Sequence, residues 1–223
     1  MRRFLAILLC FCLIGFPCVK AKEPAYVALT FDDGPSGRFT RRLLEGLDQR
    51  QVKATFLLCG YRLKDYQTLA TQIFEAGHEI GLHGYSHKNM ATLSYKELVE
   101  EITATKKLLP AGCTAAFLRP PGGCGTPLVE QVAKQENLAI LTWSVDPRDW
   151  AVHDAGAVEA AVIRQVSDGD VILLHDLSDT SVDAALSIVD KLQASGFQFV
   201  TVSQLARLRG TEIEPGNVYK AFP

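Results

Sequence analysis

The sequence predicts a single α/β domain of parallel strands covered by helices, and two observations lead to this prediction. Short apolar runs rich in β-branched residues alternate with longer segments whose apolar residues recur at helical spacing. That interleaved order needs crossover connections, which place helices over the faces of a parallel sheet. A barrel and an open doubly wound sheet both fit, and in both the chemistry lies where strands end and loops begin.

About seven strand–helix units are expected. The strands are expected at residues 26–31, 54–58, 79–82, 117–119, 138–143, 170–174 and 197–201. The helices are expected at residues 38–50, 66–76, 94–109, 128–136, 155–165, 182–195 and 203–209. The third helix is the clearest, because Ser94 is a suitable N-cap, Glu97 occupies the capping-box position and Pro110 follows the last turn.

Residues 1–21 have the features of a secretory signal peptide. Arg2 and Arg3 form a positive start, residues 4–16 are almost all apolar, and residues 19–21 place small side chains where signal peptidase reads them. The apolar run is shorter than the ~20 residues of a membrane span, which favours a cleaved signal peptide. The alternative is that the segment stays uncleaved and anchors the protein in the membrane. We therefore expect residues 22–223 to form one domain that is secreted or held in the cell envelope.

Charge and cysteine content narrow the class of partner. Removal of residues 1–21 takes away three cations and no anion, which changes the net charge from −2 to −5. That balance argues against nucleic acid or an anionic surface as the main partner. Cys59, Cys113 and Cys124 remain, and the ten residues between the last two make them the plausible disulfide pair. Without a Cys-x-x-Cys motif, a thiolate zinc site is not expected.

Polar residues of unusual type follow the predicted strands one after another. They are Asp32 and Asp33, His83 and His87, Arg119, Asp146, Asp149 and Trp150, and His175 and Asp176. Because the carboxyl ends of parallel strands share one edge, we expect these side chains to meet there. Scattered surface residues would not sort in this way, so the pattern predicts an active site.

His83 and His87 are spaced by four residues, which is a common spacing of metal ligands. Alone the pair is weak evidence, since such pairs are more often core or surface residues. A carboxylate from a neighbouring strand end completes an open three-ligand site whose remaining position holds water. The same set of ligands also suits non-haem Fe(II).

Asp32 and Asp33 are adjacent, and side chains in an extended strand alternate in direction. At a strand end that turns through Gly34-Pro35, both can still reach one pocket. One carboxylate can then bind a metal while the other accepts a proton. The alternative is an ordinary turn with a helix cap.

Three further residues gain meaning from their neighbours. His175 could be structural, or a general acid if a carboxylate favours its protonated form. Arg119 could hold a carboxylate with both arms of its guanidinium group. Trp150 could belong to the core or form the wall of a sugar site.

The chain resembles the polysaccharide deacetylases, the NodB-homology domains of carbohydrate esterase family 4, from about Tyr26 to Arg209. Five motifs appear in the family's order. They are Thr-Phe-Asp-Asp-Gly-Pro at 30–35, His-x-x-x-His at 83–87, Arg-x-Pro-x-Gly at 119–123, Asp-Pro-Arg-Asp-Trp at 146–150 and Leu-Leu-His-Asp at 173–176. Each motif is modest alone, but the ordered set is highly specific.

The resemblance implies a fold and a role for each residue. The fold is a distorted (β/α)7 barrel, similar to a TIM barrel, in a single domain. Asp33, His83 and His87 would bind a divalent metal, usually Zn²⁺, with Co²⁺ or Ni²⁺ as substitutes. Asp32 would be the general base, oriented by Arg119, and His175 the general acid, tethered by Asp149. The substrate-binding residues would be Leu173 and Trp150 at the acetyl pocket, together with Pro121 and Gly122. The backbone N–H of Gly122 would help to hold the oxyanion.

Two glycines depart from the family's pattern. Gly84 stands where a Ser or Thr commonly stabilises the loop between the histidines, which predicts a looser metal site. Gly122 stands where an aromatic residue is common, which predicts a more open pocket wall.

The expected function is removal of acetyl groups from an extracellular or cell-wall polysaccharide, with N-acetylglucosamine-type residues of peptidoglycan as the leading substrate. An O-acetyl xylan esterase and a chitin-oligomer deacetylase are alternatives within the same chemistry. A non-catalytic glycan-binding module should lack one of the catalytic groups, and all are present. An exported iron oxygenase would have no use for Asp32 and His175 beside the metal.

Overall fold

The computed structural model describes residues 24–223, so the expected signal peptide lies outside the described part of the chain. The strands are β1 (Ala25–Asp32), β2 (Thr55–Leu58), β3 (Glu79–Leu82), β4 (Phe117–Leu118), β5 (Ala139–Leu141), β6 (Val171–His175), β7 (Phe197–Phe199) and β8 (Val218–Tyr219). The α-helices are α1 (Arg38–Gln49), α2 (Gly60–Asp65), α3 (Gln67–Glu75), α4 (Tyr95–Lys106), α5 (Pro127–Gln135), α6 (Ala155–Gln165), α7 (Asp179–Ala194) and α8 (Val202–Leu208). Over these 200 residues, no helix is both long and apolar enough to cross a bilayer.

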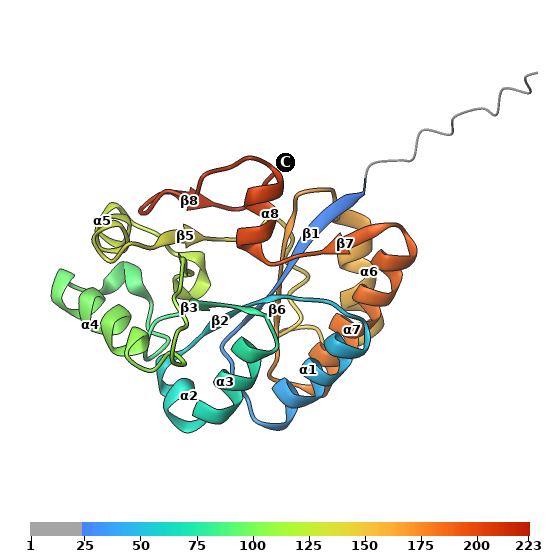
Figure 1. Ribbon diagram of the computed structural model, residues 1–223, viewed down its shortest axis with the longest axis horizontal. Coiled ribbons are helices and arrows are strands. Elements are labelled where there is room, and N and C mark those ends of the chain that lie inside the picture. The colour runs from blue at the N-terminus through green and yellow to red at the C-terminus, as the bar shows by residue number, and fades with distance from the viewer. Residues whose placement is uncertain (1–23) are drawn as a thin grey trace, which may run out of the picture.

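The strands form a distorted barrel rather than an open sheet. Their order is β6-β1-β2-β3-β4-β5-β8, every pair is parallel, and β7 adds to β1. The segment after β5 returns to β6 through a parallel bridge between Val145 and Ile172, which joins the two sides. Helices surround this curved sheet on the outside (Figure 1). The predicted barrel is confirmed, and the doubly wound alternative is wrong.

The central strand β1 explains how the core supports the site. The adjacent residues Ala28 and Leu29 are fully buried, as expected of a strand covered on both faces, and Phe31 stacks on Phe56 of β2. Burial of a large apolar side chain such as Leu29 stabilises the fold by roughly 1.5–3 kcal/mol. In the parallel register of β1 and β6, Asp32 lies beside His175. The buried strand β1 therefore determines where Asp32 and His175 come together.

Several element boundaries differ from the prediction for local reasons. Helix α2 and strand β8 were not expected, because six and two residues are too short to show a periodic pattern. Helix α7 begins at Asp179 rather than 182, since the Ser178 side chain accepts the N–H of Ser181 and caps it. The predicted capping box of Ser94 and Glu97 at the start of α4 is present.

The expected Cys113–Cys124 disulfide is absent, and the three cysteines of the described residues are free thiols. The ten intervening residues include β4, so the two thiols lie before and after a strand rather than side by side. Cys113 packs against the largest hydrophobic cluster, and burial raises its pKa to about 11. Cys124 is exposed in the loop after β4.

Candidate active site

Eight of the eleven predicted site residues line one cavity of about 460 Å³ at the carboxyl ends of the strands. They are Asp32, Asp33, His83, His87, Gly122, Trp150, Leu173 and His175. The other three, Arg119, Asp149 and Pro121, are buried and do not line the cavity. Arg119 and Asp149 instead contact Asp32 and His175, which do.

The backbone at Asp33 explains how two adjacent carboxylates reach the same cavity. Asp32 is the last residue of β1, and Asp33 adopts a left-handed conformation with φ of 71°. That conformation is uncommon for a residue with a side chain, and it ends the alternation of the strand. Asp32 consequently faces Arg119, while Asp33 faces the two histidines.

Asp33, His83 and His87 form a cluster of three potential ligands. The Oδ1 atom of Asp33 lies 3.3 Å from Nε2 of His83 and 3.0 Å from Nε2 of His87. Ligand atoms about 2.1 Å from a tetrahedral zinc ion would lie about 3.4 Å apart, so the spacing suits such an ion. Within residues 24–223, this is the only group of three metal-type ligands that converges.

The hydrogen bond of His83 selects the tautomer that a metal ligand needs. Its Nδ1 atom lies 2.6 Å from the carbonyl oxygen of Arg119. A carbonyl can only accept, so Nδ1 carries a proton, and Nε2, which faces Asp33, is the nitrogen that would bind a metal after losing its own proton. These residues therefore fit a divalent cation in donor type and orientation.

Electrostatics keep the Asp33 carboxylate ionised. Burial acts to raise its pKa, but the hydrogen bonds and positive charge of His83 and His87 outweigh burial and hold the pKa far below the usual range. The hydrogen bond to Asp33 raises the pKa of His87 in turn. The attraction shows that this pocket stabilises positive charge next to Asp33.

Arg119 is fully buried, and it fixes Asp32. Its Nη1 atom donates to Oδ1 of Asp32 at 2.6 Å and to the Thr30 hydroxyl at 2.8 Å. The rest of the guanidinium group donates to the carbonyls of Leu141 and Thr142. A buried cation with this many partners holds its anion in one place, and Oδ2 of Asp32 lies 3.7 Å from Nε2 of His83, beside the three-ligand cluster.

Asp149 holds His175 through both its ring and its backbone. Oδ1 of Asp149 lies 2.8 Å from Nδ1 of His175, and Oδ2 accepts the His175 backbone N–H at 2.9 Å. Burial disfavours the charged imidazole, but the bond and the negative charge of Asp149 prevail and raise the pKa of His175 to about 9. Near neutral pH the cavity thus contains a protonated histidine beside Asp32.

The cavity wall combines predicted and unpredicted residues. Trp150 is 57% exposed, which excludes it from the core, and Leu173 is almost buried. Asp146, one of the polar residues expected at the strand ends, also lines the cavity, while Trp143 and Leu177 line it and were not predicted. Leu177 follows Leu173 and His175 at intervals of two, and that alternation could have indicated a shared face.

The sequence is similar to a known protein family and to several curated proteins. The polysaccharide deacetylase family model matches residues 20–141. The peptidoglycan-N-acetylglucosamine deacetylase PgdA of Listeria monocytogenes serotype 1/2a is 34% identical over 202 residues, which are 90% of this chain. A peptidoglycan-N-acetylglucosamine deacetylase of Bacillus cereus is 35% identical over 189 residues, covering 82% of this chain and 89% of the relative.

A solved structure is similar over almost its entire length. The family 4 acetyl xylan esterase from Clostridium thermocellum, in complex with a cobalt ion, has a TM-score of 0.83 at 34% identity, covering 89% of this chain and 99% of that one. The chain spans only about two fifths of the length of the first curated relatives it matches. By the family model, by its identity to curated relatives and by its barrel, the chain belongs to the polysaccharide deacetylase family.

Proposed function

We propose that this protein is a divalent-metal-dependent hydrolase that removes N-acetyl groups from N-acetylglucosamine-type residues of peptidoglycan in the cell envelope. The observation that carries the proposal is that two proton carriers, each fixed by a partner of its own, line the same cavity as the three-ligand cluster. Asp32 is fixed by Arg119 and His175 by Asp149, beside Asp33, His83 and His87.

Each polar group has one task in the proposed hydrolysis. Asp33, His83 and His87 hold a divalent cation, which supplies Lewis-acid activation of water and of the acetyl carbonyl when bound. Asp32 accepts a proton from the water while the oxygen of that water attacks the carbonyl carbon. His175 donates a proton to the sugar nitrogen as the C–N bond breaks, which releases acetate and a free amine.

The cavity wall would hold the acetyl group and the sugar. Leu173 offers an apolar surface to the methyl group, and the exposed Trp150 offers an aromatic face to the ring. We assign the N–H of Gly122, beside the buried Pro121, as the donor to the developing oxyanion, an interaction worth about 3 kcal/mol.

The relatives favour peptidoglycan over other glycans. Both curated relatives described above are named for N-acetylglucosamine in peptidoglycan. Acetylxylan is the second candidate, since the structurally similar esterase is named for that substrate. Chitin oligomers are the third, because a chitooligosaccharide deacetylase of Sinorhizobium fredii is 30% identical over 200 residues. Envelope localisation rests on the predicted signal peptide at residues 1–21.

The test is acetate release from peptidoglycan, chitin oligomers and acetylxylan by the purified protein. We expect release from peptidoglycan, loss of release after chelation, and recovery with Zn²⁺, Co²⁺ or Ni²⁺. Release only from acetylxylan would contradict the N-acetyl assignment. A metal-loaded protein that binds glycan but releases no acetate from any of the three would instead identify a binding module.

A further inference from the structure

The loop between the two histidines has a backbone that needs support. Gly84 has φ of 78° and His87 has φ of 58°, so two of the five residues are left-handed, one of them with a side chain. His83 has its own anchors, because it is buried and its ring bonds to the Arg119 carbonyl. His87 is more exposed, and its ring contacts Asp33. Its position therefore depends on the loop that carries it.

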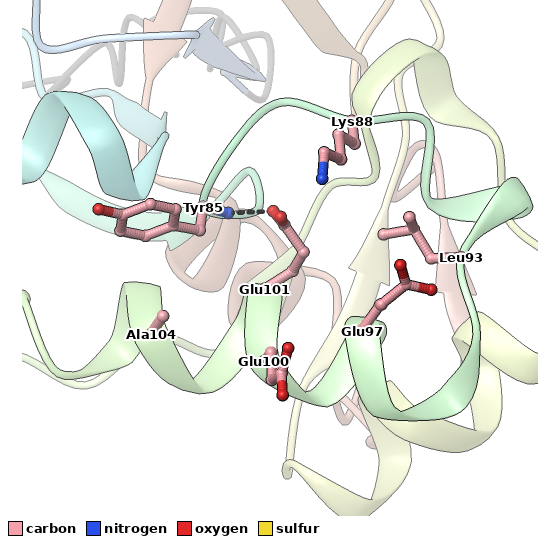
Figure 2. Close-up of a pocket in the computed structure, with 7 residues that line it drawn as sticks. All are labelled: Tyr85, Lys88, Leu93, Glu97, Glu100, Glu101 and Ala104. Carbon is pink, nitrogen blue, oxygen red and sulfur yellow. Dashed lines mark hydrogen bonds between the residues drawn. The ribbon is translucent and has the colours of Figure 1, made fainter.

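A carboxylate from α4 binds this loop from outside the cavity. Oε2 of Glu101 accepts the backbone N–H groups of Tyr85 at 2.6 Å and Ser86 at 2.8 Å. Oε1 accepts the Ser86 hydroxyl at 2.5 Å. Figure 2 shows the Glu101 carboxylate directed at the Tyr85 nitrogen, at the edge of a hollow outside the catalytic cavity. Bonds from N–H groups to an ionised carboxylate are roughly twice as strong as neutral ones.

The other side of the loop is held by α2. The first N–H groups of that helix, from Gly60 and Tyr61, donate to the carbonyls of Gly84 and Tyr85 at 2.9 Å. The loop is thus fixed between helix N–H groups, which take its carbonyls, and Glu101, which takes its N–H groups. Without Glu101, only the hydrogen bonds from α2 would still hold the loop.

A side chain at Gly84 would be strained by the φ of 78° and would have to displace two neighbours. A Cβ atom there would lie 2.8 Å from Cε of Met90 and 3.2 Å from Oε2 of Glu101. The looser loop expected from a glycine at this position is therefore compensated from α4. The carboxylate occupies the space beside the loop that a residue-84 side chain would enter.

We propose that Glu101 is a positioning residue that sets His87 for metal binding by fixing the backbone of Tyr85 and Ser86. Glu101 touches neither the substrate nor the ligand atoms, so its effect passes through the loop. The inference rests on the proposed metal site of Asp33, His83 and His87. Loss of such supporting partners typically weakens metal affinity about 10- to 100-fold.

The test measures the dissociation constant of Zn²⁺ alone, by competition with a chromophoric chelator. Glu101→Ala should raise the constant about 10- to 100-fold. Glu101→Gln should recover part of the loss, since its amide oxygen can still accept both N–H groups. Glu100→Gln is the matched control, because Glu100 is the exposed neighbour on α4 and, within the described residues, contacts only Lys96 in a long 3.8 Å ion pair.

Hydrogen exchange gives a second readout that needs no metal. In the metal-free protein, exchange at the amides of Tyr85 and Ser86 should be faster in Glu101→Ala than in the wild type or Glu100→Gln, while exchange in the core of β1 stays unchanged. Wild-type affinity and exchange in Glu101→Ala would overturn this inference and leave the metal site standing. A wild-type protein that binds no Zn²⁺ would overturn the metal site and the inference together.

Discussion

The Asp149 carboxylate binds His175 at two points, with one oxygen 2.8 Å from the ring Nδ1 and the other accepting the backbone N–H at 2.9 Å. Both groups are largely buried, so the pair lies in a medium where an unpaired charge is costly. The imidazole is fixed in orientation and in protonation by the same neighbour. This relationship makes the behaviour of the protein depend on pH in two separable ways.

Stability should fall as pH rises through the pKa of His175. That pKa is raised from 6.5 to about 9 in the folded protein. The stabilising contribution is therefore fully present below pH 6.5 and is lost as pH passes through about 9, a change of roughly 3 kcal/mol. Urea denaturation of wild type and Asp149→Asn from pH 6 to 10 should show their difference in unfolding free energy shrinking over this range. A constant difference would refute the coupling.

Turnover should also depend on whether His175 is protonated. If His175 donates it to the leaving amine, turnover of wild type should decline above about pH 9. In Asp149→Asn the burial of the ring acts with less opposition, so the alkaline limb should move to lower pH, toward 6.5 or below. The measurement is kcat against pH on metal-saturated protein. An unmoved limb would show that another group sets it.

Asp32→Asn should separate proton transfer from metal binding. Loss of a general base typically lowers kcat by about 10²–10⁴-fold. The Zn²⁺ dissociation constant should remain that of wild type, because the Oδ1 of Asp33, not Asp32, is the atom nearest both histidines. The variant also keeps an oxygen that can accept from Arg119. Markedly weaker Zn²⁺ binding would mean that Asp32 is itself a ligand.

The strand ends could be predicted because an apolar run stops there and a polar residue of unusual type follows it. The apolar runs define β3 at the predicted residues 79–82 and α6 at the predicted 155–165. Parallel pairing then brings Asp32 beside His175, as their common position after buried strands indicated. That Asp32 and His175 lie close together could be predicted from the order of strands and helices alone, and local residue patterns indicate that order.

Other features had no local pattern to reveal them. Glu101 lies on a helix face and binds backbone N–H groups, which every residue provides, so no motif indicates the contact. The plausible Cys113–Cys124 disulfide is absent because a short sequence separation does not set the distance between two thiols. The strand predicted at residues 117–119 forms as β4, and the two thiols lie before and after it.

The glycine at 123 should prove necessary for the cavity wall. Gly123 has φ of 69°, and a Cβ atom there would lie 2.9 Å from the ring of Trp143. Gly123→Ala should therefore cost about 1 kcal/mol or more in stability and lower kcat/KM by displacing Trp143, which lines the cavity. Gly125→Ala is the control, because a Cβ atom at that position would have no neighbour within 4 Å. Equal effects of the two variants would contradict this role.

Asp176 should lower the stability of the protein at neutral pH. Its carboxylate is fully buried, Oδ1 has no hydrogen-bond partner among residues 24–223, and Oδ2 accepts from the Thr40 hydroxyl. Burial raises its pKa from 3.8 to about 6, against the opposing effect of the Thr40 bond. Because the folded pKa is the higher one, the stability linked to this proton is complete below pH 3.8 and is lost as pH rises through about 6.

Asp176→Asn should therefore gain stability relative to wild type between pH 4 and 7, by up to roughly 3 kcal/mol. The change of this difference with pH is the quantity to follow, since the amide adds a constant cost by placing N–H groups where Oδ1 finds no partner. Asp65→Asn removes the same charge from an exposed position and should show no such trend. Parallel pH profiles for Asp176→Asn and Asp65→Asn would mean that the buried carboxylate titrates as it does in the unfolded chain.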